Sequence, residues 1–132
     1  MSFMQYLTPE EASQVTVVNY LLLQYPDVLF HHSPQEIHTI SKFQRWKRKV
    51  LGTIPGCPDL LIFHEKRFPI KGDKIERNYY CGLAIEMKHG RNRPTRTQND
   101  FMNKLTRAGW KCEVCYDSLE AHEVIDEYLE KK

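Results

Sequence analysis

Long apolar runs are missing from this sequence, and their absence excludes the simplest membrane architectures. No stretch approaches the roughly 18 consecutive apolar residues that indicate a membrane-spanning helix. No signal-peptide pattern opens the chain, and it contains neither an internal repeat nor a low-complexity tract. We therefore expect a cytoplasmic protein that has no membrane partner.

Cysteine is also sparse, with 4 residues in 132, and in a reducing compartment these are expected to be thiols. Cys112 and Cys115 form a C-x-x-C pattern, which is typical of zinc and redox sites. However, residues 111–116 alternate like a β-strand, on which positions three apart point to opposite faces. No second pair has the spacing of zinc ligands. We therefore expect all four cysteines to be structural.

The composition is that of an ordinary globular protein, with 41% hydrophobic and 27% charged residues. A chain of 132 residues is expected to form one domain, spanning residues 1–132, with a core that needs no disulfide support.

The formal net charge of +2 is small, but the charges are unevenly distributed. Basic residues concentrate in two stretches, whereas residues 113–130 are largely acidic. A basic face suits a polyanion, and the same charges also serve to solvate helix surfaces, so both interpretations stay open. If the basic face binds a nucleic acid, the candidates for contact with its phosphates are Lys42, Arg45, Lys47, Arg48, Lys49, Arg91, Arg93 and Arg96. Trp46, within the first basic stretch, is expected to pack into the core.

Hydrophobic periodicity and capping residues predict an α/β sandwich with a mixed sheet at its centre. The expected order is α-β-α-β-β-α-β-α, with Thr8, Ser41, Thr95 and Ser118 as helix caps. Residues 33–40 fit neither pattern, and residues 65–78 indicate a hairpin excursion. Helices are expected at 8–24, 42–51, 95–107 and 118–130, and strands at 28–32, 59–64, 79–88 and 111–116.

Three ionisable residues fall at the ends of two apolar strands that are expected to pair. Asp59 opens the first strand, and Glu86 and Lys88 share one face of the second because strand side chains alternate. An antiparallel pairing of His64 with about Gly82 brings Asp59 beside the Glu86–Lys88 end. Two carboxylates and a lysine then meet at one edge of the sheet.

This grouping fits hydrolysis of a phosphodiester. A hard cation such as Mg²⁺ takes oxygen ligands, here from Asp59, Glu86 and the main-chain carbonyl of Met87. The cation polarises a phosphoryl oxygen and lowers the pKa of bound water, while Lys88 orients or helps to deprotonate that water. The alternatives are a turn role for Asp59 after Pro58 and a structural ion pair between Glu86 and Lys88. Each short motif occurs often by chance, and only their combination on buried strands favours a site.

Three helical residues carry two interpretations each. Glu11 lies where it reaches a metal site, but it also completes a capping box with Thr8. Gln98 forms the same box pattern with Thr95. Gln14 lies near the apolar stripe, where it supports either the site or the core. Spacing alone favours the structural interpretation for all three.

An ordered set of short motifs runs from about residue 11 to residue 116. Together they resemble the VRR-NUC branch of the PD-(D/E)xK nucleases, which implies a restriction-endonuclease-like mixed sheet flanked by helices. The set consists of Glu11-x-x-Gln14, Gly56-Cys57-Pro58-Asp59-Leu60-Leu61, Ile85-Glu86-Met87-Lys88, Gly90, Thr97-Gln98, Leu105 and Ala108-Gly109.

The resemblance also implies residue roles. The metal-binding carboxylates of the family fall on Asp59 and Glu86, and the catalytic lysine falls on Lys88. The first-helix glutamate falls on Glu11, as a catalytic and metal-binding group, and the helical glutamine falls on Gln98. These matches move Glu11 and Gln98 towards a functional interpretation.

Stand-alone members of the family, many from phages and mobile elements, look like dimers that cut branched DNA, including four-way (Holliday) junctions. The resemblance therefore implies a homodimeric endodeoxyribonuclease that uses Mg²⁺ or Mn²⁺, needs no small-molecule cofactor and acts in the host cytoplasm if a phage encodes it. The aromatic residues lack the pattern of single-strand readers, which favours cutting directed by DNA shape. The alternatives are a nonspecific or restriction-like DNase of the same fold and a DNA-binding module without catalysis.

Overall fold

The computed structural model describes residues 3–33, 41–68 and 78–130. A short 3₁₀ turn, Met4–Tyr6, precedes the first helix. The helices are α1 (Pro9–Gln24), α2 (Lys42–Val50), α3 (Arg96–Arg107) and α4 (Ser118–Leu129). The strands are β1 (Phe30–His32), β2 (Leu60–Ile62), β3 (Lys66–Arg67), β4 (Tyr79–Tyr80), β5 (Leu83–Met87) and β6 (Lys111–Cys115).

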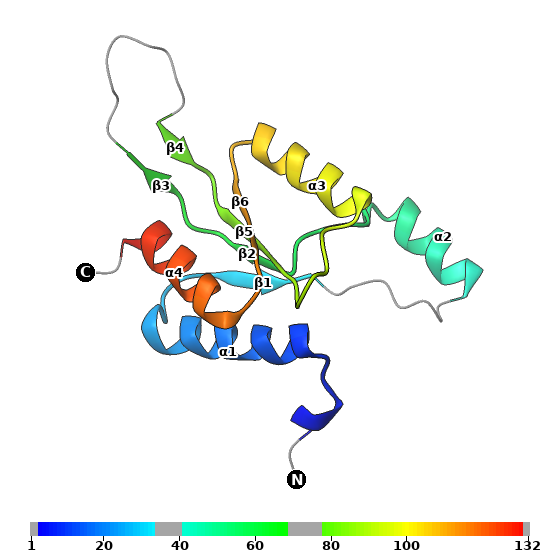
Figure 1. Ribbon diagram of the computed structural model, residues 1–132. Helices are drawn as coiled ribbons and strands as arrows, with labels where there is room; N and C mark the ends of the chain where they lie inside the picture. The colour runs from blue at the N-terminus through cyan, green and yellow to red at the C-terminus, as the bar shows by residue number, and fades with distance from the viewer. Residues whose placement is uncertain (1–2, 34–40, 69–77, 131–132) are drawn as a thin grey trace.

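The main sheet has the strand order β1-β2-β5-β6 and is mixed (Figure 1). Strand β2 runs antiparallel to both β1 and β5, whereas β5 and β6 are parallel. The parallel pair needs a crossover, which α3 provides, since it lies between β5 and β6 in the chain and packs against β6. The predicted α/β class with a central mixed sheet is therefore confirmed.

The core lies where α1 and α4 pack beside each other against the sheet. Strand β5 is buried along its whole length, and its alternating side chains serve two environments. Leu83, Ile85 and Met87 belong to the core cluster, whereas Glu86 faces the start of α3. The remaining buried members of the cluster are Val17, Leu21, Leu60, Ile62, Cys115, Ala121, Ile125 and Tyr128.

A cluster of hydroxyls around one carboxylate fixes α1 against α4. The hydroxyls of Tyr20 and Tyr25 each donate to an Asp126 oxygen at 2.6 Å. Hydrogen bonds to a charged acceptor are stronger than neutral ones. Helix α1, which carries Glu11 and Gln14, is therefore held in a defined position relative to the sheet.

Several predicted details were wrong. The strand expected at 79–88 is interrupted after Tyr80, and β4 pairs with β3 outside the main sheet. At Gly82 the chain runs so close to Trp110 that a Cβ atom would lie 2.5 Å from its ring. The register of β2 and β5 pairs Leu60 with Ile85, one residue away from the expected alignment. The cap of α4 is Asp117, whose side chain accepts from the Glu120 amide at 2.7 Å, and not Ser118.

The ambiguous stretch 33–40 and most of the excursion at 65–78 lie outside the described residues. Among the helices that the structure describes, none combines the length and the apolar character needed to cross a membrane.

Candidate active site

The β2–β5 pairing brings Asp59, Glu86 and Lys88 to one end of the two strands. Asp59 directly precedes β2, Glu86 lies in β5, and Lys88 directly follows it. All three side chains are buried, with exposed fractions of 7%, 1% and 9%. Charged side chains are rarely buried this deeply unless they are paired or bind a ligand, so this end of the sheet is the candidate site.

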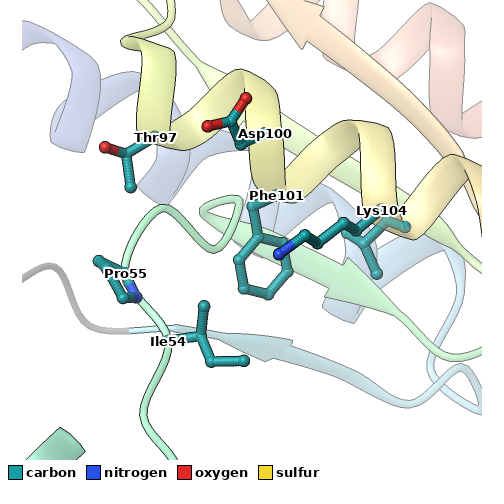
Figure 2. A pocket seen from close by; sticks show the side chains of 7 residues that line it. Ile54, Pro55, Thr97, Asp100, Phe101 and Lys104 are labelled. Atoms are coloured by element: carbon teal, nitrogen blue, oxygen red, sulfur yellow. The ribbon is translucent and has the colours of Figure 1, made fainter.

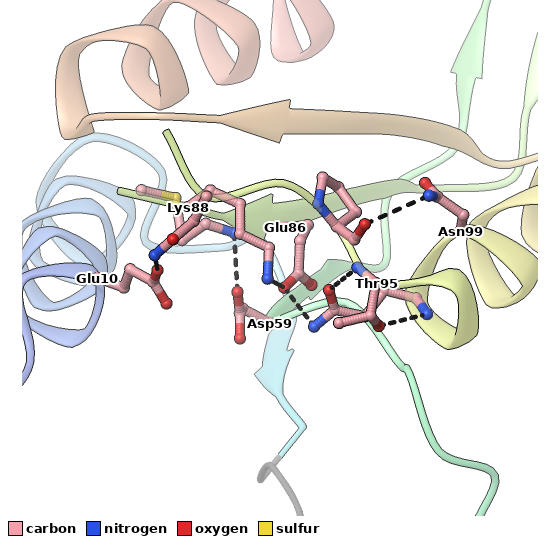
Figure 3. A network of polar contacts seen from close by, with 10 residues as sticks. Glu10, Asp59, Glu86, Lys88, Thr95 and Asn99 are labelled. Carbon is pink, nitrogen blue, oxygen red and sulfur yellow. Dashed lines mark hydrogen bonds and ion pairs between the residues drawn. The ribbon is translucent and has the colours of Figure 1, made fainter. Parts of the chain in front are cut away.

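Direct contacts link the three residues (Figure 3). The Met87 amide donates a hydrogen bond of 2.8 Å to Oδ2 of Asp59, which ties this carboxylate to β5. Lys88 Nζ lies 3.4 Å from Oε1 of Glu86. The predicted meeting of two carboxylates and one lysine therefore matches the observed geometry, and the Glu86–Lys88 ion pair is part of it.

Of the three side chains, Glu86 has the least favourable environment for its charge. Its Oε1 accepts from Gln98 Nε2 at 3.0 Å, but its Oε2 is buried and has no hydrogen-bond partner within the part of the chain that the structure describes. Burial, and then the nearby Asp59 carboxylate, raise the pKa of Glu86 from 4.5 to about 8, although Lys88 opposes the shift. A buried carboxyl group that has a raised pKa and one oxygen without a hydrogen-bond partner indicates a place for a positive ligand.

Gln98 forms the capping box that its position predicted, and it also contacts Glu86. Its Oε1 accepts from the Thr95 amide at 2.9 Å, and its own amide donates to Thr95 Oγ1 at 3.2 Å, so the capping box is complete. The amide group at the other end of the same side chain donates to Glu86. The start of α3 therefore fixes the orientation of Glu86 through a residue that is itself fixed by its cap.

A close approach of two main chains holds Asp59 near α3. Gly56 has φ +90°, which favours glycine, and a Cβ atom there would lie 2.5 Å from the Thr97 carbonyl oxygen.

The next residue, Cys57, is half-buried, and burial raises the pKa of its thiol. This thiol is therefore not an activated nucleophile.

Glu11 does not contact the carboxylate pair in the structure. It is exposed, and its carboxylate accepts from the Thr8 amide at 2.9 Å in a complete capping box. That hydrogen bond lowers the pKa of Glu11. Its neighbour Glu10 is the α1 carboxylate that reaches the loop after Lys88, where Asn92 Nδ2 donates to it at 3.2 Å.

Gln14 approaches the site through a residue that the sequence patterns did not single out. Its side-chain nitrogen lies 2.8 Å from Nδ1 of His32, and the same Nδ1 lies 2.8 Å from the main-chain oxygen of Asp59. His32 ends the short strand β1, and nothing in its local pattern distinguishes it from His31.

The predicted basic residues lie on the surface around this end of the molecule. None of the eight forms an ion pair with another of the described residues. Arg91 and Arg93 line a hollow of about 670 Å³ together with Tyr116, which follows β6. Tyr116 was not predicted at the site, because only the parallel pairing of β5 with β6 brings it near the loop after Lys88.

The expectation that Trp46 packs into the core was wrong. Helix α2 has no buried residue and extends away from the sheet (Figure 1). Its apolar side chains Phe43, Trp46 and Val50 are between 58% and 64% exposed. Their spacing of three and four residues places them on one face of the helix, where they lack a covering element within the described residues.

A second hollow of about 370 Å³ lies between the loop before β2 and α3 (Figure 2). Its floor is apolar, with Phe101 of α3 opposite Ile54 and Pro55, and Asp100 and Lys104 stand at its rim. Ile54 is itself 63% exposed. The uncovered apolar surface therefore includes this hollow as well as α2.

The residues present fit a hard divalent cation held by few protein ligands. The described residues contain no group of three or more His, Cys, Asp or Glu side chains arranged for a metal. Mg²⁺ and Mn²⁺, however, often take one or two carboxylates and keep several waters. Asp59 and Glu86 supply two carboxylates, and the buried unpartnered Oε2 of Glu86 is the observation that supports this fit.

Comparisons with known proteins identify a family and a similar fold. The model of the VRR-NUC domain family matches residues 5–118. A solved structure named VRR_NUC domain protein is similar at a TM-score of 0.69 with 25% sequence identity, over 94% of this chain and 90% of that one. No curated protein matches the chain.

The raised pKa of Glu86 predicts how stability depends on pH in the absence of metal. Between pH 4.5 and about 8 the folded protein keeps a proton that the unfolded chain releases, so its stability falls as the pH rises through this window. The loss is at most about 1.4 kcal/mol per pH unit. Glu86→Gln removes this dependence. In urea unfolding with chelator, the free energy of unfolding of the variant is therefore expected to rise relative to that of the wild type as the pH increases to about 8.

Glu123→Gln, which removes an exposed carboxyl group from α4, is the matched control and should follow the wild type. Parallel stability curves for the wild type and Glu86→Gln would contradict the prediction.

Proposed function

Because this chain belongs to the VRR-NUC domain family, we propose that it is a metal-dependent DNA endonuclease of the PD-(D/E)xK type, formed by residues 1–132 as one domain. The observation that carries the proposal is the burial of Asp59, Glu86 and Lys88 at one end of paired strands, where Glu86 Oε2 has no hydrogen-bond partner among the described residues. A structural ion pair alone needs only Glu86 and Lys88, and does not require the second buried carboxylate, that of Asp59, which raises the pKa of Glu86.

In the proposed mechanism, Asp59 and Glu86 would hold the cation, with the main-chain carbonyl of Met87 as a further ligand. Mg²⁺ or Mn²⁺ held there would supply a Lewis acid for the phosphoryl oxygen and for the attacking water. Lys88 would orient the attacking water and stabilise the negative charge that develops on the phosphate. Gln98 keeps Glu86 in its rotamer through the 3.0 Å hydrogen bond.

We propose branched DNA, such as a four-way junction, as the substrate. The support is the pattern of basic residues, which lie exposed on α2 and in the loop after Lys88 without carboxylate partners among the residues described. Phosphate contacts of this kind give affinity without base specificity, so selectivity comes from the shape of the DNA. A nonspecific or restriction-like DNase of the same fold is the second candidate, because it needs the same site and the same basic surface.

We propose that the protein acts as a homodimer, because cutting two strands of a symmetric junction requires two sites. The uncovered apolar face of α2 supports this proposal, since Phe43, Trp46 and Val50 are all more than half exposed. Arg45 and Lys49 lie on a different face of the same helix. A second copy can therefore cover the apolar face while the basic face remains open to DNA.

The first prediction of the proposed function concerns the cutting of DNA. The wild type is expected to cut a four-way junction with Mg²⁺ or Mn²⁺ and to stop in chelator, and Asp59→Ala and Lys88→Ala should lower the rate by about 100-fold or more. Lys111→Ala, which removes a lysine paired with Glu113 at 3.9 Å, is the control and should cut normally.

A comparison of four-way junction, flap, linear duplex and single strand then separates the candidates. Equal rates on all four would favour the nonspecific DNase, binding without cutting would favour a non-catalytic module, and unimpaired cutting by both variants would remove the proposed mechanism.

The second prediction separates the two roles of Glu11. Thr8→Ala breaks the capping box, whereas Glu11→Gln keeps a side chain that completes such a box, as Gln98 does with Thr95, and removes only the carboxylate that the family resemblance assigns to the metal site. We expect Thr8→Ala to lose about 1 kcal/mol of stability with normal activity, and Glu11→Gln to keep its stability but to lose activity at limiting Mg²⁺. Equal activity of the two variants would leave Glu11 with its capping role only.

The third prediction concerns the dimer. Sedimentation of the wild type is expected to give twice the 15.7 kDa mass of one chain, and Trp46→Ser should shift it towards the monomer. Arg45→Ser on the other face of α2 is the control: it should remain dimeric and bind DNA more weakly, with a smaller salt dependence. A monomeric wild type that still cuts junctions would contradict the proposal.

A further inference from the structure

We propose that His32 is a positioning residue for the metal-binding carboxylate, held as the tautomer that carries a proton on Nδ1; this inference rests on the proposed function. His32 is the last residue of β1 and pairs with Leu60 of β2, so it stands beside Asp59. Its ring links α1, through Gln14, to the main chain of the residue that bears the carboxylate.

The contacts define where the proton lies. Nδ1 of His32 is 2.8 Å from the carbonyl oxygen of Asp59, and two lone pairs at that distance would repel each other. A proton on Nδ1 converts the contact into a hydrogen bond that His32 donates. The side-chain amide of Gln14 lies 2.8 Å from the same Nδ1. With this amide group rotated, its oxygen faces Nδ1 and is a second acceptor for the proton.

These contacts fix Asp59 on three sides. Its carbonyl oxygen accepts from His32 and, at 3.3 Å, from the Ser33 amide, while its carboxylate accepts from the Met87 amide at 2.8 Å. The direction of a carboxylate depends on the position of its own main chain, and outer residues that fix a ligand typically contribute 10- to 100-fold in metal affinity. His32 acts at the carbonyl end of Asp59, 2.8 Å from that oxygen, whereas the Met87 amide acts at the carboxylate end.

The position of His32 also gives α1 a contact with the site that does not depend on the metal-binding role proposed for Glu11. Gln14 and Glu11 belong to α1, and Glu11 lies close enough to His32 for the two to interact electrostatically. The cluster of Tyr20, Tyr25 and Asp126 fixes α1 against α4, so Gln14 approaches the His32 ring from a fixed support.

Three substitutions at one position test the inference by geometry. His32→Ala removes the donor. His32→Asn keeps an N–H donor near the place of Nδ1, whereas His32→Gln places its amide nearer the position of Nε2. His31→Ala is the matched control, because His31 is the preceding histidine of the same strand, is exposed as His32 is, and pairs with Leu61.

The first readout is the affinity for Mn²⁺, measured on the full chain without DNA from the electron paramagnetic resonance signal of the free ion. We expect His32→Ala and His32→Gln to weaken binding about 10-fold or more, and His32→Asn and His31→Ala to stay within about 3-fold of the wild type. Thermal unfolding in chelator shows whether each variant is folded.

The second readout is junction cutting as a function of Mg²⁺ concentration. His32→Ala is expected to raise the half-saturating Mg²⁺ concentration about 10-fold and to regain a near-normal rate at saturation, because the catalytic groups themselves are intact. Unchanged Mn²⁺ affinity in a folded His32→Ala protein, with binding lost in Asp59→Ala, would overturn this inference and leave the proposed function standing. Absence of Mn²⁺ binding by the wild type would overturn both.

Discussion

The burial of the Glu86 carboxylate on the central strand is the constraint that organises the rest of the site. A carboxyl group with 1% exposure and one unpartnered oxygen within the described structure is costly, and the pKa of about 8 expresses that cost. The neighbouring Asp59 adds to it, because two nearby carboxylates repel each other. A divalent cation bound at this place would offset the penalty for both carboxylates at once, which is why the proposed function assigns a metal to them.

Each surrounding element can be understood by what it contributes to this one end of the sheet. The antiparallel pairing of β2 with β5 supplies both carboxylates, and α3 supplies Gln98, whose capping box fixes its side chain before it reaches Glu86. Gly56 allows the loop before β2 to touch the first turn of α3. The site is therefore held by rigid elements and by main-chain contacts, which gives the reacting groups little freedom to lose on binding.

The central triad was predictable from the sequence because it follows from local rules. Strand alternation places Glu86 and Lys88 on one face, and antiparallel pairing brings Asp59 beside them even though the register was expected one residue away. His32 was not predictable, because its role depends on a three-residue edge strand and on a contact with α1 that no local pattern encodes. Trp46 was misjudged because helical periodicity reports an apolar face but not what covers it.

Helix α2 is the element whose sequence is least explained by contacts within the described part of one chain. The exposure of large apolar side chains on its surface to water is unfavourable, and its basic side chains repel one another. Such a helix gains little from folding onto its own domain, since it buries no residue there. Its sequence is better explained by two partners, a hydrophobic one for the face of Phe43 and Trp46 and a polyanion for the face of Arg45. In the proposed function these partners would be a second copy of the chain and DNA, and phosphate contacts of this kind would favour a DNA shape rather than a base sequence.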